Sequence, residues 1–295
     1  MKISVALCTF NGEKYLEEQL KSIINQSVKV DEIVIGDDQS TDTTVEILKN
    51  YQKNYPDLIR LIFNEKNVGY IKNFENVINH CNGDLIFLSD QDDIWFPEKV
   101  EKIQNTFKNN NNISVISHNL QILLKDNKIH QDFFWTQLKF DVNSSNEEII
   151  RTVLLNGNIF PGMSLAITKE ATKYLPFYNL NKFLVHDFQL VINSCNEKKF
   201  LVLNDVLAIY RLHESQNIGF DLSKKPNNDI NELFIRKNNR NEFVEILKLF
   251  NLNSKFLQDY DFKTQEIFNQ LLKKHRFIER ILLYVKLRFY YKLLQ

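Results

Sequence analysis

Residues 84–93 read DLIFLSDQDD, a mostly apolar run that ends in three carboxylates within four positions. A continuous apolar run of this length is typical of a strand buried on both faces of a parallel sheet. Open α/β sheets bind their ligands in the crevice beyond the carboxyl ends of the strands. The sequence therefore predicts that the acidic loop at 90–93 lies at a ligand site.

Two upstream stretches repeat this pattern of a buried strand followed by polar residues. ISVALC at 3–8 leads into TFNG at 9–12, and EIVIG at 32–36 leads into DDQSTD at 37–42. Strands that alternate with helices of 8–15 residues predict βαβ units, hence an α/β fold with a mostly parallel central sheet and flanking helices. The other elements expected in this half are helices near 15–24, 43–51 and 72–81 and a strand at 58–64.

After Pro97 the alternation becomes less regular. A polar stretch at 215–231 that contains Pro226 favours a domain boundary, with a catalytic domain at 1–217 and a helical region at 218–295. Between Pro97 and this polar stretch, the expected elements are helices near 97–109, 149–155 and 183–193, one or two strands at 113–124 and a strand at 163–168.

The chain has 37 Lys and Arg residues against 37 Asp and Glu residues, so no global field favours nucleic acid as a partner. Residues 271–295 nevertheless carry seven cations and one anion among many aromatic and aliphatic residues. A basic amphipathic segment of this kind predicts contact with an anionic membrane surface. The alternative is a helix packed on the catalytic domain with its cations pointing outward.

Three cysteines without a CxxC spacing indicate free buried thiols in a reducing compartment. The N-terminus is expected to be a strand and not a signal peptide, and no apolar run is long enough to span a bilayer. The expected location is the cytoplasm, at the inner face of the cell membrane if residues 271–295 bind there.

Asp90, Asp92 and Asp93 repel one another unless a cation lies between them, and oxygen-rich sites suit Mg²⁺ or Mn²⁺. The loop therefore predicts a divalent ion. The alternative for the acidic loop is a solvated loop in which Asp93 caps the following turn. Asp42, in the loop at 37–42, has a similar alternative, which is to cap the helix from Thr43. No GxGxxG or GxxxxGK[ST] loop occurs, which disfavours dinucleotide dehydrogenases and P-loop NTPases.

Taken together, these motifs resemble the inverting, nucleotide-sugar-dependent glycosyltransferases with the GT-A fold, of the family 2 type. Three later landmarks follow in the family's order, at 161–166, 186–187 and 210–217, and the last two look most like the subgroup that includes rhamnosyltransferases of bacterial cell-surface polysaccharides. The early strings that carry the resemblance are SVALCTFNGEKYLEEQLKSI (4–23), DEIVIGDDQSTDTT (31–44), NVGYIKNF (67–74) and GDLIFLSDQDDIW (83–95).

The resemblance implies a nucleotide pocket at these strand ends. Asp38 would accept from the pyrimidine N–H, which agrees with its chemistry because uracil and thymine have an N3–H donor and cytosine lacks one. Lys72 has the alternative of being a solvated helix residue. The other residues implied in nucleotide-sugar binding are Thr9, Asn11, Glu13, Asn67 and Gly69.

The resemblance also implies the reaction centre. Asp90-Gln91-Asp92 would be the DxD motif, with Asp92 binding the metal that bridges the diphosphate. Asp187 would be the general base, preceded by His186 where the family commonly has Glu, so that His186 is either a partner of Asp187 or the acceptor, or a structural residue. His213 would reach the metal or the diphosphate, and Arg211 would serve the phosphates.

The predicted function is metal-dependent inverting transfer of a sugar, either rhamnose from dTDP-rhamnose or a hexose from a UDP-sugar, to a saccharide or lipid-linked saccharide acceptor. Two alternatives stay open from the sequence. One is a nucleotidyltransferase, although residues 9–14 lack the Gly-rich, Lys-containing loop that such enzymes normally show. The other is a carbohydrate-binding or nucleotide-sugar-binding protein that has kept the fold without turnover.

Overall fold

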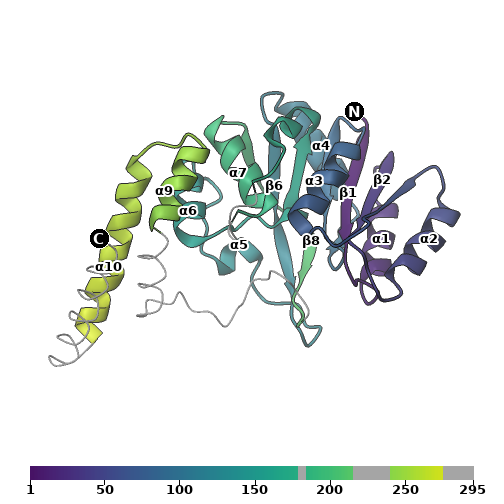
Figure 1. Ribbon diagram of the computed structural model, residues 1–295, viewed down its shortest axis with the longest axis horizontal. Helices are drawn as coiled ribbons and strands as arrows, with labels where there is room; N and C mark the ends of the chain where they lie inside the picture. Colours follow the sequence, from purple (N-terminus) through teal and green to yellow (C-terminus); the bar gives the residue numbers. More distant parts are fainter. Residues whose placement is uncertain (179–183, 215–239, 275–295) are drawn as a thin grey trace. The chain divides into compact units, whose positions relative to one another are not determined.

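The computed structural model describes residues 1–178, 184–214 and 240–274 (Figure 1). By its internal contacts the chain divides into two compact units, Met1–Gly219 and Phe220–Gln295. The predicted boundary at 217/218 falls outside the described residues. All site residues predicted from the sequence belong to the first unit.

The first unit is built on a mixed sheet of eight strands in the order β3-β2-β1-β4-β7-β6-β8-β5. The prediction of an α/β fold with flanking helices is confirmed. The strands are β1 Ile3–Thr9, β2 Glu32–Asp37, β3 Ile59–Phe63, β4 Leu85–Ser89, β5 Ile94–Trp95, β6 Val115–Leu123, β7 Leu165–Thr168 and β8 Phe200–Arg211.

The half of the sheet formed by β3, β2, β1 and β4 is parallel, and β1 and β4 are buried along their whole length. β1 lies between β2 and β4, with Thr9 opposite Asp37 and Leu7 opposite Ser89. The carboxyl ends of these three strands therefore meet at one edge of the sheet. The three polar loops that the sequence placed after buried strands lie side by side there.

The other half of the sheet contains antiparallel pairs. β7 pairs antiparallel with both β4 and β6, whereas β8 runs parallel to β6 and antiparallel to the two-residue strand β5. The expected strand at 163–168 is shorter than predicted, because Gly162–Ser164 forms a 3-10 turn, η1, ahead of β7. β8 was not predicted as a strand, and it brings Arg211 next to the acidic loop through the pairing of Ile94 with Ile209.

The helices of the first unit are amphipathic and flank the sheet. α3 packs closest to β2 at Gly36, where an added Cβ would lie 2.4 Å from a Val77 methyl carbon and 2.5 Å from Asn73 Oδ1. The helices are α1 Leu16–Ile24, α2 Thr44–Asn54, α3 Tyr70–His80, α4 Lys99–Asn109, α5 Phe134–Gln137, α6 Asn146–Asn156 and α7 His186–Asn196, with a second 3-10 segment, η2, at Lys169–Tyr174.

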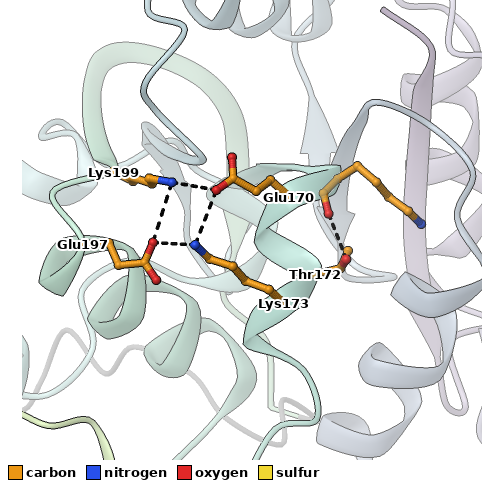
Figure 2. Close-up of polar contacts among 6 residues, drawn as sticks. Glu170, Thr172, Lys173, Glu197 and Lys199 are labelled. Carbon is orange, nitrogen blue, oxygen red and sulfur yellow. Dashed lines mark hydrogen bonds and ion pairs between the residues drawn. The ribbon is translucent and has the colours of Figure 1, made fainter.

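An alternating set of surface charges ties η2 to the connection between α7 and β8 (Figure 2). Lys173 Nζ lies 2.6 Å from Glu197 Oε2, and Lys199 Nζ lies 2.6 Å from Glu170 Oε1. Solvent screens such exposed pairs, and each contributes no more than about 1 kcal/mol to the free energy of unfolding. The network sets the local geometry of this surface more than it stabilises the fold.

The described part of the second unit is a pair of helices, α9 Arg240–Leu249 and α10 Lys255–Lys274. The rings of Phe243 and Tyr260 lie 4.2 Å apart between centroids, and Arg240 makes two hydrogen bonds to the Asp261 carboxylate. Most of the basic segment predicted to contact a membrane, 275–295, lies outside the described residues. Among the residues that are described, no helix combines the length and apolarity needed to cross a membrane. All three cysteines are free and buried, as predicted.

The close approach at Gly36 gives a test of the fold. Gly36→Ala is expected to lower the free energy of unfolding by about 1–3 kcal/mol, because the new methyl group overlaps Val77 and Asn73 in a packed core. Urea denaturation followed by circular dichroism measures the change. An unaltered urea midpoint would contradict the packing of α3 on β2.

Candidate active site

Asp37 connects the ends of β1 and β2 through hydrogen bonds. Its Oδ2 accepts from the Thr9 hydroxyl at 3.0 Å and from the Ser40 hydroxyl, while Oδ1 accepts from the Ser40 N–H. Asp37 and Thr9 are both 2% exposed. Thr9, which the family resemblance placed in the nucleotide pocket, thus directs its hydroxyl to Asp37.

Asn11 and Glu13 lock the β1–α1 loop onto the β2–α2 loop. Asn11 Oδ1 accepts from the Thr41 N–H at 2.8 Å, and Glu13 Oε2 accepts from the Thr43 N–H at 3.0 Å and its hydroxyl at 2.7 Å. The Asp42 carboxylate accepts from the Glu13 N–H at 3.1 Å and from the Thr44 N–H at 3.0 Å, although the N-cap position of α2 is Thr43 and not Asp42. These side chains shape the rim of the site by holding its two loops in register.

Asp38 is 3% exposed and receives three hydrogen bonds. Its Oδ1 accepts from the Asn64 amide at 2.9 Å and the Val68 N–H at 2.8 Å, and its Oδ2 accepts from the Gly69 N–H at 2.8 Å. The Asn67 amide donates to the Asp38 carbonyl at 3.2 Å. Because an ionised carboxylate has about four acceptor positions, Oδ2 retains room for one further donor.

Lys72 lies on α3 and forms a local ion pair. Its Nζ is 2.9 and 3.0 Å from the two Glu75 carboxylate oxygens, and Glu75 in turn accepts from the Phe177 N–H at 2.8 Å. The Lys72 side chain is 42% exposed. The structure therefore places Lys72 as a half-solvated helix residue, which was the alternative interpretation of this position.

Gln91 attaches the acidic loop to the loop after β1. Its Oε1 accepts from the Phe10 N–H at 2.8 Å, and its Nε2 donates to the Phe10 carbonyl at 3.0 Å. Gln91 and Phe10 thus exchange two hydrogen bonds, as paired residues of neighbouring strands do, and both polar atoms of the Gln91 side-chain amide are used. Gln91 thereby fixes where its neighbours Asp90 and Asp92 lie relative to β1.

Asp92 and His213 face each other, with Oδ2 and Nε2 2.7 Å apart. Arg211 connects the same two segments, because its Nε donates to the Asp92 carbonyl at 2.9 Å and its Nη2 to Glu18. The Tyr15 ring lies 4.8 Å from the His213 ring and 4.7 Å from the Arg211 guanidinium carbon. The structure thus brings together Asp92, Arg211 and His213, three residues that the family resemblance implied at one site, with the Arg211 guanidinium bound to the Asp92 carbonyl and Glu18.

Asp93 is buried and does not cap the turn that follows it. Its Oδ1 accepts from the Arg211 N–H at 3.2 Å, so the carboxylate reaches across to β8. Burial raises the pKa of Asp93 well above its ordinary value, and the charges of Asp92 and Asp90 raise it further. Sequence patterns missed this contact because β8 was not predicted.

Asp90 interacts electrostatically with Asp187, the catalytic base predicted from the sequence. Burial raises the pKa of Asp90 to about 8, with contributions from the charges of Asp92 and Asp187, and a hydrogen bond from the Met163 N–H acts in the opposite direction. The dependence on Asp187 indicates that the end of β4 and the start of α7 share one electrostatic environment. Asp90 and Asp187 are 97 positions apart in sequence and belong to one site.

Asp187 lies in the first turn of α7. Burial raises the pKa of Asp187 to about 6, while hydrogen bonds from the Phe188 N–H, the Asn158 side chain and the Gly162 N–H favour the ionised form. A carboxylate with this pKa is ionised at neutral pH and still has a useful affinity for a proton. Those are the properties required of a general base.

His186 is packed between aromatic rings and does not contact Asp187 through a hydrogen bond. Its ring stacks on Phe74 with centroids 4.0 Å apart, and neither ring nitrogen has a hydrogen-bond partner among the described residues. Burial lowers the pKa of His186 to about 3, so the imidazole is neutral at physiological pH. An added Cβ at Gly162 would lie 2.7 Å from His186 Nε2, which explains the absence of a side chain there.

Within the described ranges, no group of three or more His, Cys, Asp or Glu side chains is arranged to hold a metal ion. Asp92 and His213 provide two ligand types that suit Mn²⁺. Magnesium and manganese at nucleotide sites are commonly held by one or two protein ligands plus substrate phosphates. The residues present therefore fit a divalent ion that is bound together with a diphosphate.

The structural comparisons agree with this topology. TarS from S. aureus, solved in complex with UDP-GlcNAc, superposes with a TM-score of 0.60 over 94% of this chain and 74% of that chain, at 20% identity. The mannosyltransferase PcManGT from Pyrobaculum calidifontis, solved with GDP-Man and Mn²⁺, gives a TM-score of 0.56 over 98% of this chain and 80% of that chain, at 14% identity. At these identities the likeness concerns the fold, which is the GT-A fold of glycosyltransferases.

Sequence comparisons give the family. The model of Glycosyl transferase family 2 matches residues 4–172, and the chain belongs to this family. The dTDP-rhamnosyl transferase RfbG of Shigella flexneri is 28% identical over 235 residues, which cover 74% of this chain and 75% of RfbG. An uncharacterized glycosyltransferase of Nostoc is also 28% identical, over 221 residues, and the match spans 66% of that relative's length.

The three hydrogen bonds that the buried Asp38 carboxylate accepts give a test of how the site is built. Asp38→Ala leaves the Val68 and Gly69 N–H groups and the Asn64 amide without their acceptor, and is expected to lower the free energy of unfolding by about 2–4 kcal/mol. Thermal and urea denaturation measure the loss. Asp57→Ala, an exposed position, is the matched control and is expected to change stability by less than about 0.5 kcal/mol. Equal midpoints for the two variants would contradict the hydrogen bonds assigned to Asp38.

Proposed function

We propose that the protein is an inverting glycosyltransferase that transfers a sugar from a nucleoside diphosphate donor to a saccharide or lipid-linked saccharide acceptor. The observation that carries the proposal is the shared environment of Asp187 and Asp90, beside the Asp92–His213 pair on the same acidic loop. Family membership supports the same reaction class. These groups supply an acid–base function and two ligands for a divalent cation at one edge of the sheet.

Asp187 acts as the general base in this proposal. Inversion needs a single displacement, in which one base takes the proton of the acceptor hydroxyl while that oxygen attacks the anomeric carbon. The Phe188 N–H donates to Asp187 Oδ1 at 2.7 Å and so helps to orient the carboxylate. His186, being neutral and packed on Phe74, adds no charge beside it.

Asp92 and His213 hold a divalent ion, Mn²⁺ or Mg²⁺, together with the donor diphosphate. Such an ion neutralises charge on the departing nucleoside diphosphate. Asp92 and His213, 2.7 Å apart, would hold the ion, and Arg211 Nε fixes the Asp92 backbone through its carbonyl. The Glu18 carboxylate already engages Arg211 from the outer side.

The nucleotide base lies at Asp38, whose Oδ2 has room for one further donor. This chemistry selects uracil or thymine, so the donor is linked to UDP or dTDP. The identity with RfbG over three quarters of both chains favours dTDP-rhamnose. The acceptor belongs to cell-surface polysaccharide synthesis, and residues 271–295 bring the enzyme to the membrane that carries a lipid-linked acceptor.

A nucleotide panel tests the donor site. UDP or dTDP with Mn²⁺ is expected to raise the melting temperature, whereas GDP and CMP have little effect, because only the first two offer an N3–H to Asp38. Asp92→Ala is expected to abolish the dependence on Mn²⁺, and Asp57→Ala to retain it. Thermal shift and isothermal titration measure both. A flat response to all four nucleotides would favour a non-catalytic protein on this fold.

Substitution of the base tests the reaction. Asp187→Asn is expected to lower the transfer rate by at least about a hundredfold while nucleotide affinity is retained. Glu197→Gln, near the other end of α7, is the matched control and should transfer at the wild-type rate. Since burial raises the pKa of Asp187 to about 6 and the active form is ionised, wild-type kcat should rise with pH through about 6. Near-normal turnover of Asp187→Asn would rule out this base.

A further inference from the structure

The aromatic ring of Tyr15 lies against two side chains that reach the acidic loop. Its centroid is 4.8 Å from that of the His213 ring and 4.7 Å from the Arg211 guanidinium carbon. Aromatic rings at such a separation attract each other, and a guanidinium over an aromatic face adds a cation–π interaction. One ring at the start of α1 therefore contacts side chains from the end of β8 and from the residues after it.

The backbone of Tyr15 is fixed, so its ring has a defined place. The Tyr15 and Leu16 N–H groups both donate to the Gly12 carbonyl at 3.1 Å, and Leu16 is fully buried. Gly12 in turn packs on the acidic loop, because an added Cβ there would lie 2.2 Å from Gln91 Oε1. Tyr15 thus belongs to a segment that is itself anchored to the acidic loop.

Arg211 uses its guanidinium to join α1 to the acidic loop. Its Nε donates to the Asp92 carbonyl at 2.9 Å, and its Nη2 donates to the Glu18 carboxylate. The Arg211 side chain is only 9% exposed. The Tyr15 ring lies beside this junction, where it contacts the guanidinium that both partners share.

His213 meets the acidic loop through one ring nitrogen. Its Nε2 lies 2.7 Å from Asp92 Oδ2, and both side chains are mostly buried. A hydrogen bond at a single nitrogen fixes that atom but leaves the ring able to pivot about it. The Tyr15 contact limits this pivot, in the way that outer groups commonly orient the side chains that bind a metal.

We propose that Tyr15 is a positioning residue that holds His213 against Asp92, and Arg211 against the backbone of the same loop, so that Asp92 and His213 stay paired. Tyr15 itself touches neither the ion nor the donor. The inference rests on the proposed function, in which Asp92 and His213 hold a divalent ion together with a diphosphate. It gives a role to a residue of the β1–α1 loop that the sequence motifs left unassigned.

Nucleotide affinity with and without Mn²⁺ tests this role and needs no turnover. Isothermal titration of UDP and of dTDP, each in EDTA and in Mn²⁺, gives a ratio of dissociation constants that reports how strongly the ion and the nucleotide favour each other's binding. Tyr15→Leu is expected to lower this ratio about 3–10-fold, because the ring contacts to His213 and Arg211 are lost. Affinity in EDTA should stay at the wild-type value.

Two variants control for the change itself. Tyr15→Phe keeps the ring that makes both contacts and should retain the wild-type ratio. Tyr55→Leu removes a tyrosine that is 39% exposed and stacks on Tyr51 of α2, and it should retain the ratio as well. The electron paramagnetic resonance signal of free Mn²⁺ at saturating UDP gives an independent readout. Tyr15→Leu should leave more Mn²⁺ free than either control.

The outcomes separate this role from the proposed function. If wild-type binding depends on Mn²⁺ and Tyr15→Leu keeps the wild-type ratio, the positioning role is overturned, and so it is if Tyr15→Phe loses as much as Tyr15→Leu. If Tyr15→Leu does not fold, Tyr15→Met, which also lacks a ring, takes its place with the same expected ratio. Wild-type binding that is equal in EDTA and in Mn²⁺ overturns the metal site and the positioning role together. Absence of both nucleotide binding and transfer in the wild type overturns the proposed function instead, before any variant is made.

Discussion

Three carboxylates within four residues, at the end of a buried strand, are the constraint on which the rest of the site depends. Asp90, Asp92 and Asp93 repel one another, and burial makes that repulsion stronger than it is in water. Two of them are held by one distant segment, the end of β8 and the residues after it: Asp93 accepts from the Arg211 N–H, and Asp92 faces His213. The loop can fold because distant segments converge on it.

This convergence explains the antiparallel half of the sheet. β5 is only two residues long, yet its pairing with β8 places Arg211 and His213 against the loop that precedes β5. α4 then starts with Lys99, which reaches the turn before β7. Short elements thus determine where the charged groups of the site lie.

The parallel half of the fold was predictable because β1, β2 and β4 are buried along nearly their whole length and have apolar sequences. β8 was not, since its sequence, FLVLNDVLAIYR, mixes polar and apolar residues along a strand of mixed burial. The residue types in the sequence identified where the site lies, but they did not show which group each side chain contacts. Asn11, Glu13 and Gln91 suit a nucleotide pocket by chemistry, whereas their polar atoms bind neighbouring loops. The burial of Lys99 was missed because a lysine in a helix is normally expected to be exposed.

The loops at this edge bind one another before any ligand arrives. The Glu13 carboxylate accepts from the Thr43 N–H and the Asp38 carboxylate from the Gly69 N–H, while the Gln91 amide donates to the Phe10 carbonyl. A site whose groups are fixed in this way loses little free energy to reorganisation when charge develops in the reaction. Buried polar atoms that have no hydrogen-bond partner among the described residues are therefore exceptions at this edge of the sheet. His186 has two such ring nitrogens in a buried, aromatic setting, and burial keeps the imidazole uncharged next to Asp187 in the chain.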